Sequence, residues 1–291
     1  MTKSDDLVGI ALMTLGMAAY AAADALIKVT SGFVESSQII LVIGLGGFIM
    51  FCIAALSRGE RLLTPMALSG AVTIRNIGEV MAAVGIVTAL QHVPLSLVTT
   101  IMQCVPLLVA AGSCIFLREH ISLKEWAAIV LGFVGMLVIL RPGNVAFEPY
   151  TLVAVLSALG LAIRDLASRA VPKGTSSIQI SVWACAVLGL VGLAMSAFSN
   201  SGGLNTSLFP SLILLLMIIL TGLGMFCITA AMRTGSVGVV SPFRYSRLLF
   251  GLFFGVVFFG EVLDAYTVFG GALIVICGLY TLSQQIKKIQ T

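Results

Sequence analysis

Two arginines stand inside an apolar stretch near the end of the chain. The stretch reads SPFRYSRLLFG over residues 241–251, with Arg244 and Arg247 three residues apart and no acidic residue beside them. A charge at the centre of a bilayer costs about 2.5–3.5 kcal/mol on insertion scales, so such residues usually face a bundle interior or water. The two arginines are therefore candidates for binding an anionic group, together with Tyr245, or for ion pairs with acids of neighbouring helices.

A second pair of charges stands in TIRNIGEVMAA, where Glu79 follows Arg75 by one helical turn. Arg75 lies about ten residues, or ~15 Å, into its apolar segment, which places it close to the bilayer midplane. The two side chains could neutralise each other as a buried pair. Alternatively they could face a cavity, where Arg75 would hold a carboxylate through its planar fork and Glu79 would meet an ammonium group or carry a proton.

Two further acid–base pairs have the helical spacing i,i+4 with the acid first, which is the better order for pairing. They are Asp24 with Lys28 and Asp165 with Arg169, each near the end of an apolar segment. They are interpreted either as structural clamps at helix ends or as gates. Their matching placement at opposite ends would suit a symmetric pair of gates.

Five uncharged polar residues could complete a solute pocket, namely Tyr20, Gln38, Gln103, Gln179 and Trp183. Trp183 could enclose an apolar part of a solute or serve as packing at the membrane interface. The six cysteines lie in apolar stretches without CxxC or Cys/His spacing, so we expect packing roles for them. The sequence predicts no metal site and no cofactor.

The composition is that of a membrane protein. Of the 291 residues, 59% are hydrophobic and 10% are charged, and the mean hydropathy is +1.13. A soluble domain carries about 25% charged residues. We therefore expect an all-α polytopic membrane protein whose partners are the lipid bilayer and a small-molecule solute, and not nucleic acid.

Ten apolar segments are long enough to cross a bilayer, which takes about 20 residues. Cutting the chain at polar, glycine and proline clusters places them at 8–30, 37–57, 65–90, 95–117, 122–140, 150–170, 177–198, 208–232, 237–259 and 264–285.

The basic residues outside these segments predict the orientation. With the N-terminus in the cytoplasm, ten lysines and arginines fall on the cytoplasmic side, whereas Lys28 and Arg141 fall outside. The ten are Lys3, Arg58, Arg61, Arg118, Lys124, Arg169, Lys173, Arg233, Lys287 and Lys288. This positive-inside bias predicts that both termini are cytoplasmic and that the protein lies in a bacterial-type inner membrane.

The two halves of the chain match weakly but in register. An offset of 141 aligns Asp24 with Asp165 and Gln38 with Gln179, and an offset near 142 aligns Glu119 with Glu261. We therefore expect two repeats, residues 1–143 and 144–291, with five helices each. Because five is odd, the second repeat would enter the membrane from the opposite side, which is an inverted repeat typical of secondary transporters.

The repeat also provides a comparison for the arginines. At an offset of 142, Arg244 matches Met102 and Tyr245 matches Gln103. A helix can therefore be built at this place without an arginine, which favours a functional role for Arg244.

Residues 75–143, which include LQHVPLSLVTT and FLREH, and residues 239–280 each resemble an EamA-type repeat. This resemblance is to the drug/metabolite transporter superfamily in its ten-helix form. It implies two inverted five-helix repeats around a central cavity, with the fifth and tenth helices packed outside. Members move amino acids, nucleotide sugars, sugar phosphates and other small metabolites.

Inside the spans, four arginines outnumber Asp24, Glu79 and Asp165, so the interior is cationic on balance. The charge balance predicts an anionic or zwitterionic solute. Since the EamA branch is similar to bacterial amino-acid and metabolite exporters, the resemblance implies a secondary transporter that exports amino acids or related carboxylate-bearing solutes by alternating access. The alternatives are export of nucleosides, drugs or sugar derivatives, and a membrane enzyme, for which HExxH and GxSxG motifs are lacking. The chain also lacks GxxxxGK[ST], so a solute or ion gradient would drive transport, with protons as a candidate through Glu79. An oligomer is open but not implied.

Overall fold

The computed structural model describes residues 3–60, 62, 69–118, 121–141, 148–171, 175–198, 208–234 and 237–290. Within these ranges every regular element is a helix, which confirms the all-α prediction. Arg61, Glu119 and Lys173, which entered the sequence predictions, lie outside the described residues.

The helices in the first half of the chain are α1 (Lys3–Thr30), α2 (Ser36–Ser57), α3 (Gly70–His92), α4 (Leu95–Met102), α5 (Val105–Leu117) and α6 (Leu123–Leu140). The second half contains α7 (Tyr150–Arg169), α8 (Ser177–Phe198), α9 (Leu208–Thr234), α10 (Val237–Val240), the 3-10 helix η2 (Ser241–Tyr245), α11 (Ser246–Phe259) and α12 (Ala265–Gln290). In the described part of the chain, ten helical segments are long and apolar enough to span a membrane. They coincide with the ten predicted segments to within a few residues.

Two of the spans are broken. Span four consists of α4 and α5, which meet at Gln103 and Cys104. Pro106 stands at the start of α5 and has no backbone N–H to continue the ladder of α4. Span nine begins with α10 and the 3-10 turn that contains Pro242, before α11 continues it. Pro242, which lacks a backbone N–H, is the sequence signal for the break in span nine, whereas the break in span four was missed.

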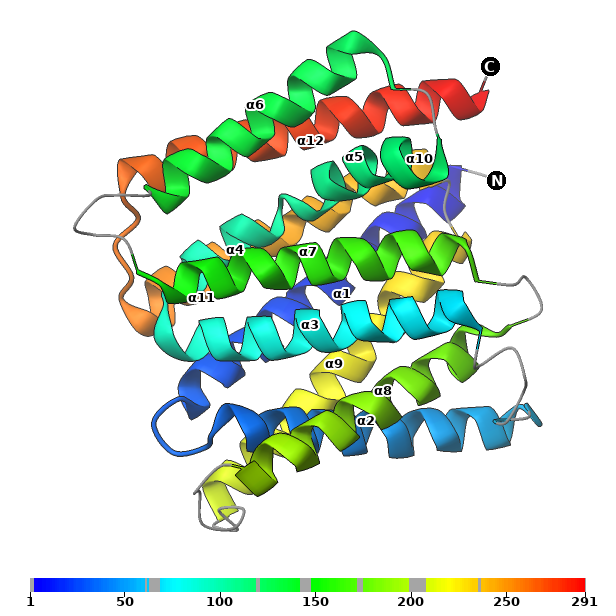
Figure 1. Cartoon of the computed structure of the whole chain (residues 1–291), viewed down its shortest axis with the longest axis vertical. Coiled ribbons are helices and arrows are strands. Elements are labelled where there is room, and N and C mark those ends of the chain that lie inside the picture. Colours follow the sequence, from blue (N-terminus) through cyan, green and yellow to red (C-terminus); the bar gives the residue numbers. More distant parts are fainter. Residues whose placement is uncertain are drawn as a thin grey trace.

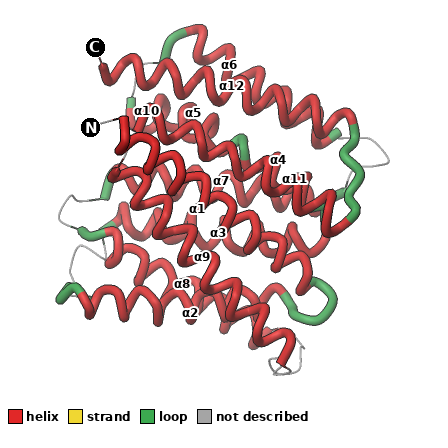
Figure 2. The backbone as a smooth tube through the Cα atoms, turned by 180° about the vertical axis from the view of Figure 1, so that it is seen from behind, coloured by secondary structure: helices red, strands yellow, loops and turns green. Residues whose placement is uncertain are grey.

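The helices lie side by side, with α6 and α12 along one edge of the molecule and α2 and α8 along the opposite edge (Figure 1). The view from behind shows the same order (Figure 2). The most extensive packing joins α2 to α8, α3 to α7, α1 to α9 and α6 to α12. Each of these pairs takes one helix from each half of the chain. The same four helix pairs result when each span is replaced by its counterpart five spans along the chain, for example α1 by α7 and α9 by α3.

Small residues allow these helices to approach closely, as is common in membrane bundles. A Cβ added at Gly78 of α3 would lie 2.7 Å from the Arg164 nitrogen and 2.8 Å from the Gly160 oxygen of α7. At the α6–α12 crossing, a Cβ on Gly135 would lie 2.9 Å from the Gly270 oxygen. Contact between α3 and α7 therefore brings the charged residues beside these glycines together.

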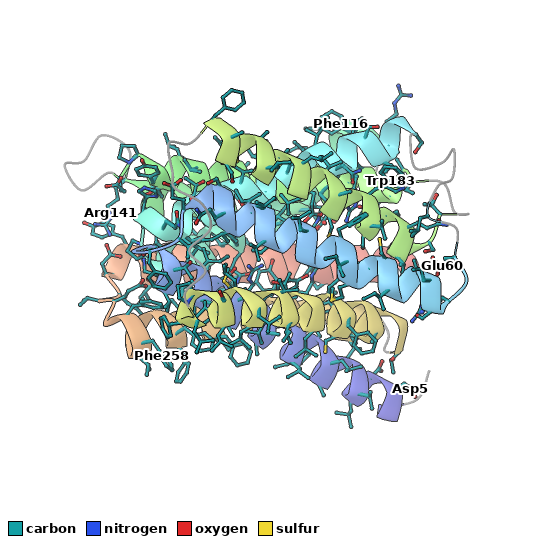
Figure 3. All side chains as sticks on the ribbon, turned by 90° about the horizontal axis from the view of Figure 1, so that it is seen from below. Asp5, Glu60, Phe116, Arg141, Trp183 and Phe258 are labelled. Carbon is teal, nitrogen blue, oxygen red and sulfur yellow. The ribbon has the colours of Figure 1, made fainter. Side chains whose placement is uncertain are left out.

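Figure 3 shows the bundle from below, with its two ends at the left and the right. Asp5 and Glu60 lie at one end, called here the Asp5 end, and Arg141 and Phe258 lie at the other, called the Arg141 end. Lys28, in the last turn of α1, belongs to the Arg141 end because α1 begins at the Asp5 end.

Candidate functional site

Four charged side chains of α3 and α7 form a chain of alternating sign, called here the α3–α7 cluster. Arg75 Nη2 lies 3.3 Å from one carboxylate oxygen of Glu79, and Arg164 Nη1 lies 3.6 Å from the other. Arg164 also donates to Asp165 Oδ1 through Nη2 at 2.8 Å and through Nε at 2.9 Å. The predicted pairing of Arg75 with Glu79 is therefore present, but as part of a larger network.

Arg164 joins the two halves of the chain in this cluster. Its sequence position beside Asp165 gave it no role in the prediction, because neighbouring residues on a helix point in different directions. The close approach of α7 to Gly78 allows the long guanidinium group to reach both Glu79 and Asp165. A signal was present in the sequence, since Arg164 is a charge well inside a span and has to find an acid.

The second ion pair joins α1 to α11. Arg247 donates to Asp24 Oδ2 through Nη2 at 2.6 Å and through Nε at 3.2 Å. The Asp24 carboxylate is buried, and the Arg247 guanidinium lies 5.4 Å from the centre of the Tyr20 ring. The predicted contact of Asp24 with Lys28 on the same helix is thus corrected, because an arginine of the other half takes the carboxylate.

Tyr20 lies on the same helix as Asp24. It stands one helical turn before Asp24 on α1 and is partly buried. The centre of its ring lies 5.4 Å from the Arg247 guanidinium of α11. Because α1 packs against both α3 and α11, the two groups of charges lie on helices that share a neighbour.

Arg244 differs from the other three arginines inside the spans. Its side chain is exposed. Among the described residues no acidic group pairs with it, whereas Arg75, Arg164 and Arg247 each have an acid. An unpaired guanidinium in lipid is costly, so we expect the exposed side chain of Arg244 to face a polar region. Among the arginines that the structure describes inside the spans, Arg244 is thus the free cation.

Two of the other three residues of the predicted clamps, Lys28 and Asp165, also have partners other than the predicted ones. Lys28 Nζ lies 3.8 Å from Glu261 Oε1 at the Arg141 end. Asp165 is held by Arg164 in the α3–α7 cluster, and Arg169 is exposed at the last residue of α7. The sequence prediction missed Glu261 as a partner because it lies 233 residues from Lys28.

The hydroxyl of Tyr245 is packed against α12. Tyr245 is 7% exposed, and its hydroxyl lies against Gly278 of α12, where a Cβ would collide with it. Among the described residues that hydroxyl has no hydrogen-bond partner. Neighbouring residues of a 3-10 turn project about 120° apart, and a role for Tyr245 in binding beside Arg244 stays a prediction.

Three polar residues predicted for the pocket lie elsewhere or face other groups. Gln103 is 5% exposed at the break in span four, and its Nε2 has no partner among the described residues. Gln38 lies in the first turn of α2, at an end of the bundle. Trp183 donates its indole N–H to the Leu62 carbonyl at 3.1 Å, toward the Asp5 end (Figure 3). The indole N–H of Trp183 is therefore bonded to the backbone at Leu62, and contact of its ring with a solute stays a prediction.

No group of three or more His, Cys, Asp or Glu side chains that could hold a metal is found in the part of the chain that the structure describes. The six cysteines are free.

The sequence model of the EamA-like transporter family matches residues 7–141 and again residues 149–284. Among similar proteins, the riboflavin transporter of Rhizobium johnstonii is 28% identical over 215 residues, which is 72% of this chain and 70% of that protein. The S-adenosylmethionine uptake transporter of Rickettsia bellii is 25% identical over 67% of this chain and 66% of its own length. The pseudopaline exporter CntI of Pseudomonas aeruginosa is 25% identical over 92% of this chain and 93% of its own.

A solved crystal structure aligns with the whole of this chain and the whole of its own, with a TM-score of 0.62 at 19% identity. At this identity the likeness concerns the fold.

Proposed function

The chain belongs to the EamA-like transporter family, and from this premise we propose that it exports small carboxylate-bearing solutes, such as amino acids and their relatives, by alternating access. The relatives are named as transporters, which supports transport and not an enzymatic reaction as the activity. The solute class and the direction of transport are inferred from the charged residues and the orientation, as follows.

The observation that carries the solute class is the free cation, Arg244. Four arginines and three acids lie well inside the spans, and each acid is already paired with another arginine, which leaves one positive charge over. A guanidinium group binds a carboxylate through two parallel hydrogen bonds, and this geometry is favoured over a point contact. The carboxylate of a bound solute would take the place of the acid that Arg244 lacks.

The paired arginines have another role in this proposal. The Asp24–Arg247 pair and the Arg164–Glu79 contact each join one half of the chain to the other. They hold the halves in register around the region that Tyr20 and Arg244 face. Removing one partner would leave a buried charge uncompensated, so we expect these pairs to support the cavity and not to bind the solute directly. Proton coupling through Glu79 stays a prediction, and it would require Glu79 to leave two arginines.

The division into repeats 1–143 and 144–291 and their inverted relation are part of the same proposal. The packing pattern supports it, because exchanging the halves leaves the pattern of helix pairs unchanged. In such transporters the site lies between the repeats and is opened to either side by their rocking.

We further propose that the Asp5 end faces the cytoplasm and the Arg141 end faces outward across the inner membrane, because of the positive-inside bias. The names of the relatives include both uptake and export. Export is favoured because the exporter is similar over 92% of this chain, more than either of the other two.

A binding titration of purified protein tests the role of Arg244. The probes are a panel of L-amino acids and, for each, the amide that lacks the carboxylate. We expect Arg244→Ala to weaken binding of the acids at least about tenfold, as for the loss of a charge-assisted pair. Amides should bind weakly to both proteins.

The matched control is Arg58→Ala, because Arg58 is an exposed arginine at the Asp5 end outside the charged region. It should bind as the unsubstituted protein does. Equal affinity of Arg244→Ala and the unsubstituted protein for every carboxylate solute that binds would refute the proposed site.

A further inference from the structure

A carboxylate from the second half of the chain closes onto a helix of the first half at the Arg141 end. Glu261 follows α11, and its two oxygens accept hydrogen bonds from the backbone N–H groups of Leu95 at 2.6 Å and Ser96 at 2.8 Å. These N–H groups stand at the start of α4, where a helix has donors without internal partners and a partial positive charge. Glu261 therefore caps α4 from another span.

Lys28 of α1 joins the same contact. Its Nζ lies 3.8 Å from Glu261 Oε1 and donates to the Val93 carbonyl at 2.7 Å. The Glu261 side chain is 9% exposed, and Val93 is fully buried. We call Lys28, Glu261 and the first residues of α4 the end latch. The latch binds α1 and α4 of the first half to α11 of the second.

The local backbone is built to admit this carboxylate. Gly260 has a φ of 62° and ends α11, so the chain turns and Glu261 N–H bonds back to the Gly255 carbonyl at 3.0 Å. A Cβ at Gly255 would lie 2.6 Å from Glu261 Oε2. Gly255 therefore leaves the space that the carboxylate occupies, which a mere surface contact would not require.

The place of the latch indicates movement as well as stability. It joins the outer parts of spans four and nine, which are the two broken spans among the described residues. The break at Gln103 and Cys104 separates α4, which has eight residues, from α5, so it is the point about which α4 would tilt if the contact opened. When α4 leaves Glu261, its first N–H groups can bond to water, so the contact is reversible.

We propose that the end latch is the outer gate of this transporter and that the structure is its outward-closed state. Glu261 is the residue that must leave α4 before a solute can pass to the outside. This inference rests on the alternating-access cycle and orientation proposed above, but it depends neither on the identity of the solute nor on Arg244.

The test uses a cysteine reporter behind the latch. Thr99 is 1% exposed on α4 and faces α11, where a Cβ on Gly251 would lie 2.7 Å from its Oγ1. In a full-length chain whose six cysteines are replaced, Thr99→Cys is labelled in intact cells with a membrane-impermeant maleimide. The reagent reaches this position from outside only when α4 and α11 separate, so slow labelling is expected with the latch intact.

Three variants then release the latch by different routes. Glu261→Ala removes the carboxylate and should raise the labelling rate at least about tenfold. Glu261→Gln keeps the size but loses one acceptor and the charge, and should raise the rate severalfold. Gly255→Ala keeps Glu261 and improves helix propensity, yet its methyl group displaces the carboxylate, so it should also accelerate labelling.

Asp264→Ala is the matched control. Asp264 pairs with Arg141 and so ties α6 to α12 at the same end, three residues from Glu261. Its loss should leave the labelling rate unchanged. Rates equal to the parent in Glu261→Gln and Gly255→Ala would overturn the proposal even if Glu261→Ala could not be purified. Acceleration in inverted vesicles and not in cells would overturn the outer assignment. A failed Arg244 titration would leave all these rates as they are, so the two proposals fail separately.

Discussion

Spans four and nine occupy matching places in the two halves, yet their surroundings differ greatly. Within the apolar window of span four 72% of residues are buried, against 17% in span nine. Both spans are broken, and each break carries a buried polar atom without a partner among the described residues, Gln103 Nε2 and Tyr245 Oη. The matching positions next to them hold Met102, which is 5% exposed, and Arg244, which is exposed.

The comparison distinguishes residues that the fold requires in both halves from a residue that we propose binds the solute. A break with a polar residue occurs in both halves, so it belongs to the scaffold and its movement. An arginine without an acid among the described residues occurs in one half. Under the proposed function, the same place in the fold serves packing in the first half and solute binding in the second.

The largest effect is expected when span four is given the arginine that span nine carries. Met102→Arg would put a charge into a buried position that has no acid beside it in the α4–α5 break. Insertion scales and overpacking together suggest a loss of about 4 kcal/mol or more of stability. The midpoint of thermal unfolding in detergent, or the folded yield, measures it. A variant as stable as the parent would show that Met102 has access to the polar region.

The second prediction contrasts the two arginines of span nine. Arg247→Ala leaves Asp24 buried without its partner and should cost about 3 kcal/mol. Arg244→Ala should cost less than about 0.5 kcal/mol, because the exposed side chain has no acid to lose. Thermal unfolding of the two purified variants measures the difference.

A double variant checks the cause. Asp24→Asn together with Arg247→Ala should regain part of the lost stability, because neither charge is then left alone. If the double variant loses the sum of the two single effects, Arg247 stabilises the bundle by packing and not through Asp24.

The smallest effects are expected at the two unpartnered polar atoms. Gln103→Leu and Tyr245→Phe remove buried groups that lack partners, so each should change stability by about 1 kcal/mol or less, and in the stabilising direction. Equal changes in stability in the two variants would support the structural equivalence of the two breaks. A clear loss in Tyr245→Phe alone would show that its hydroxyl has a partner in another state of the cycle.

Much of the fold could be predicted from the sequence. The ten spans lie where the apolar segments are, with starts and ends close to those observed, because a bilayer requires long apolar helices. The break in span four escaped prediction. Pro106 was its signal, but a proline near the start of a helix is also compatible with an unbroken span.

The candidate site was predicted less completely. Arg75 with Glu79 follows from spacing along one helix, and the structure contains that pair. Asp24 with Lys28 has the same spacing, yet Asp24 is taken by Arg247 and Lys28 by Glu261. Spacing alone cannot rank a neighbour one turn away against an arginine that another helix brings to 2.6 Å.

The sequence by itself determined which charges lie inside the membrane. Hydropathy and length place Asp24, Glu79, Asp165 and four arginines within spans, and a buried charge must find compensation or water. The tertiary structure decided which partner each of them has, because that depends on how helices from the two halves cross and rotate. Close crossings such as Gly78 against Gly160 let long arginine side chains reach across the halves, and the same packing left Arg244 with no acid among the described residues.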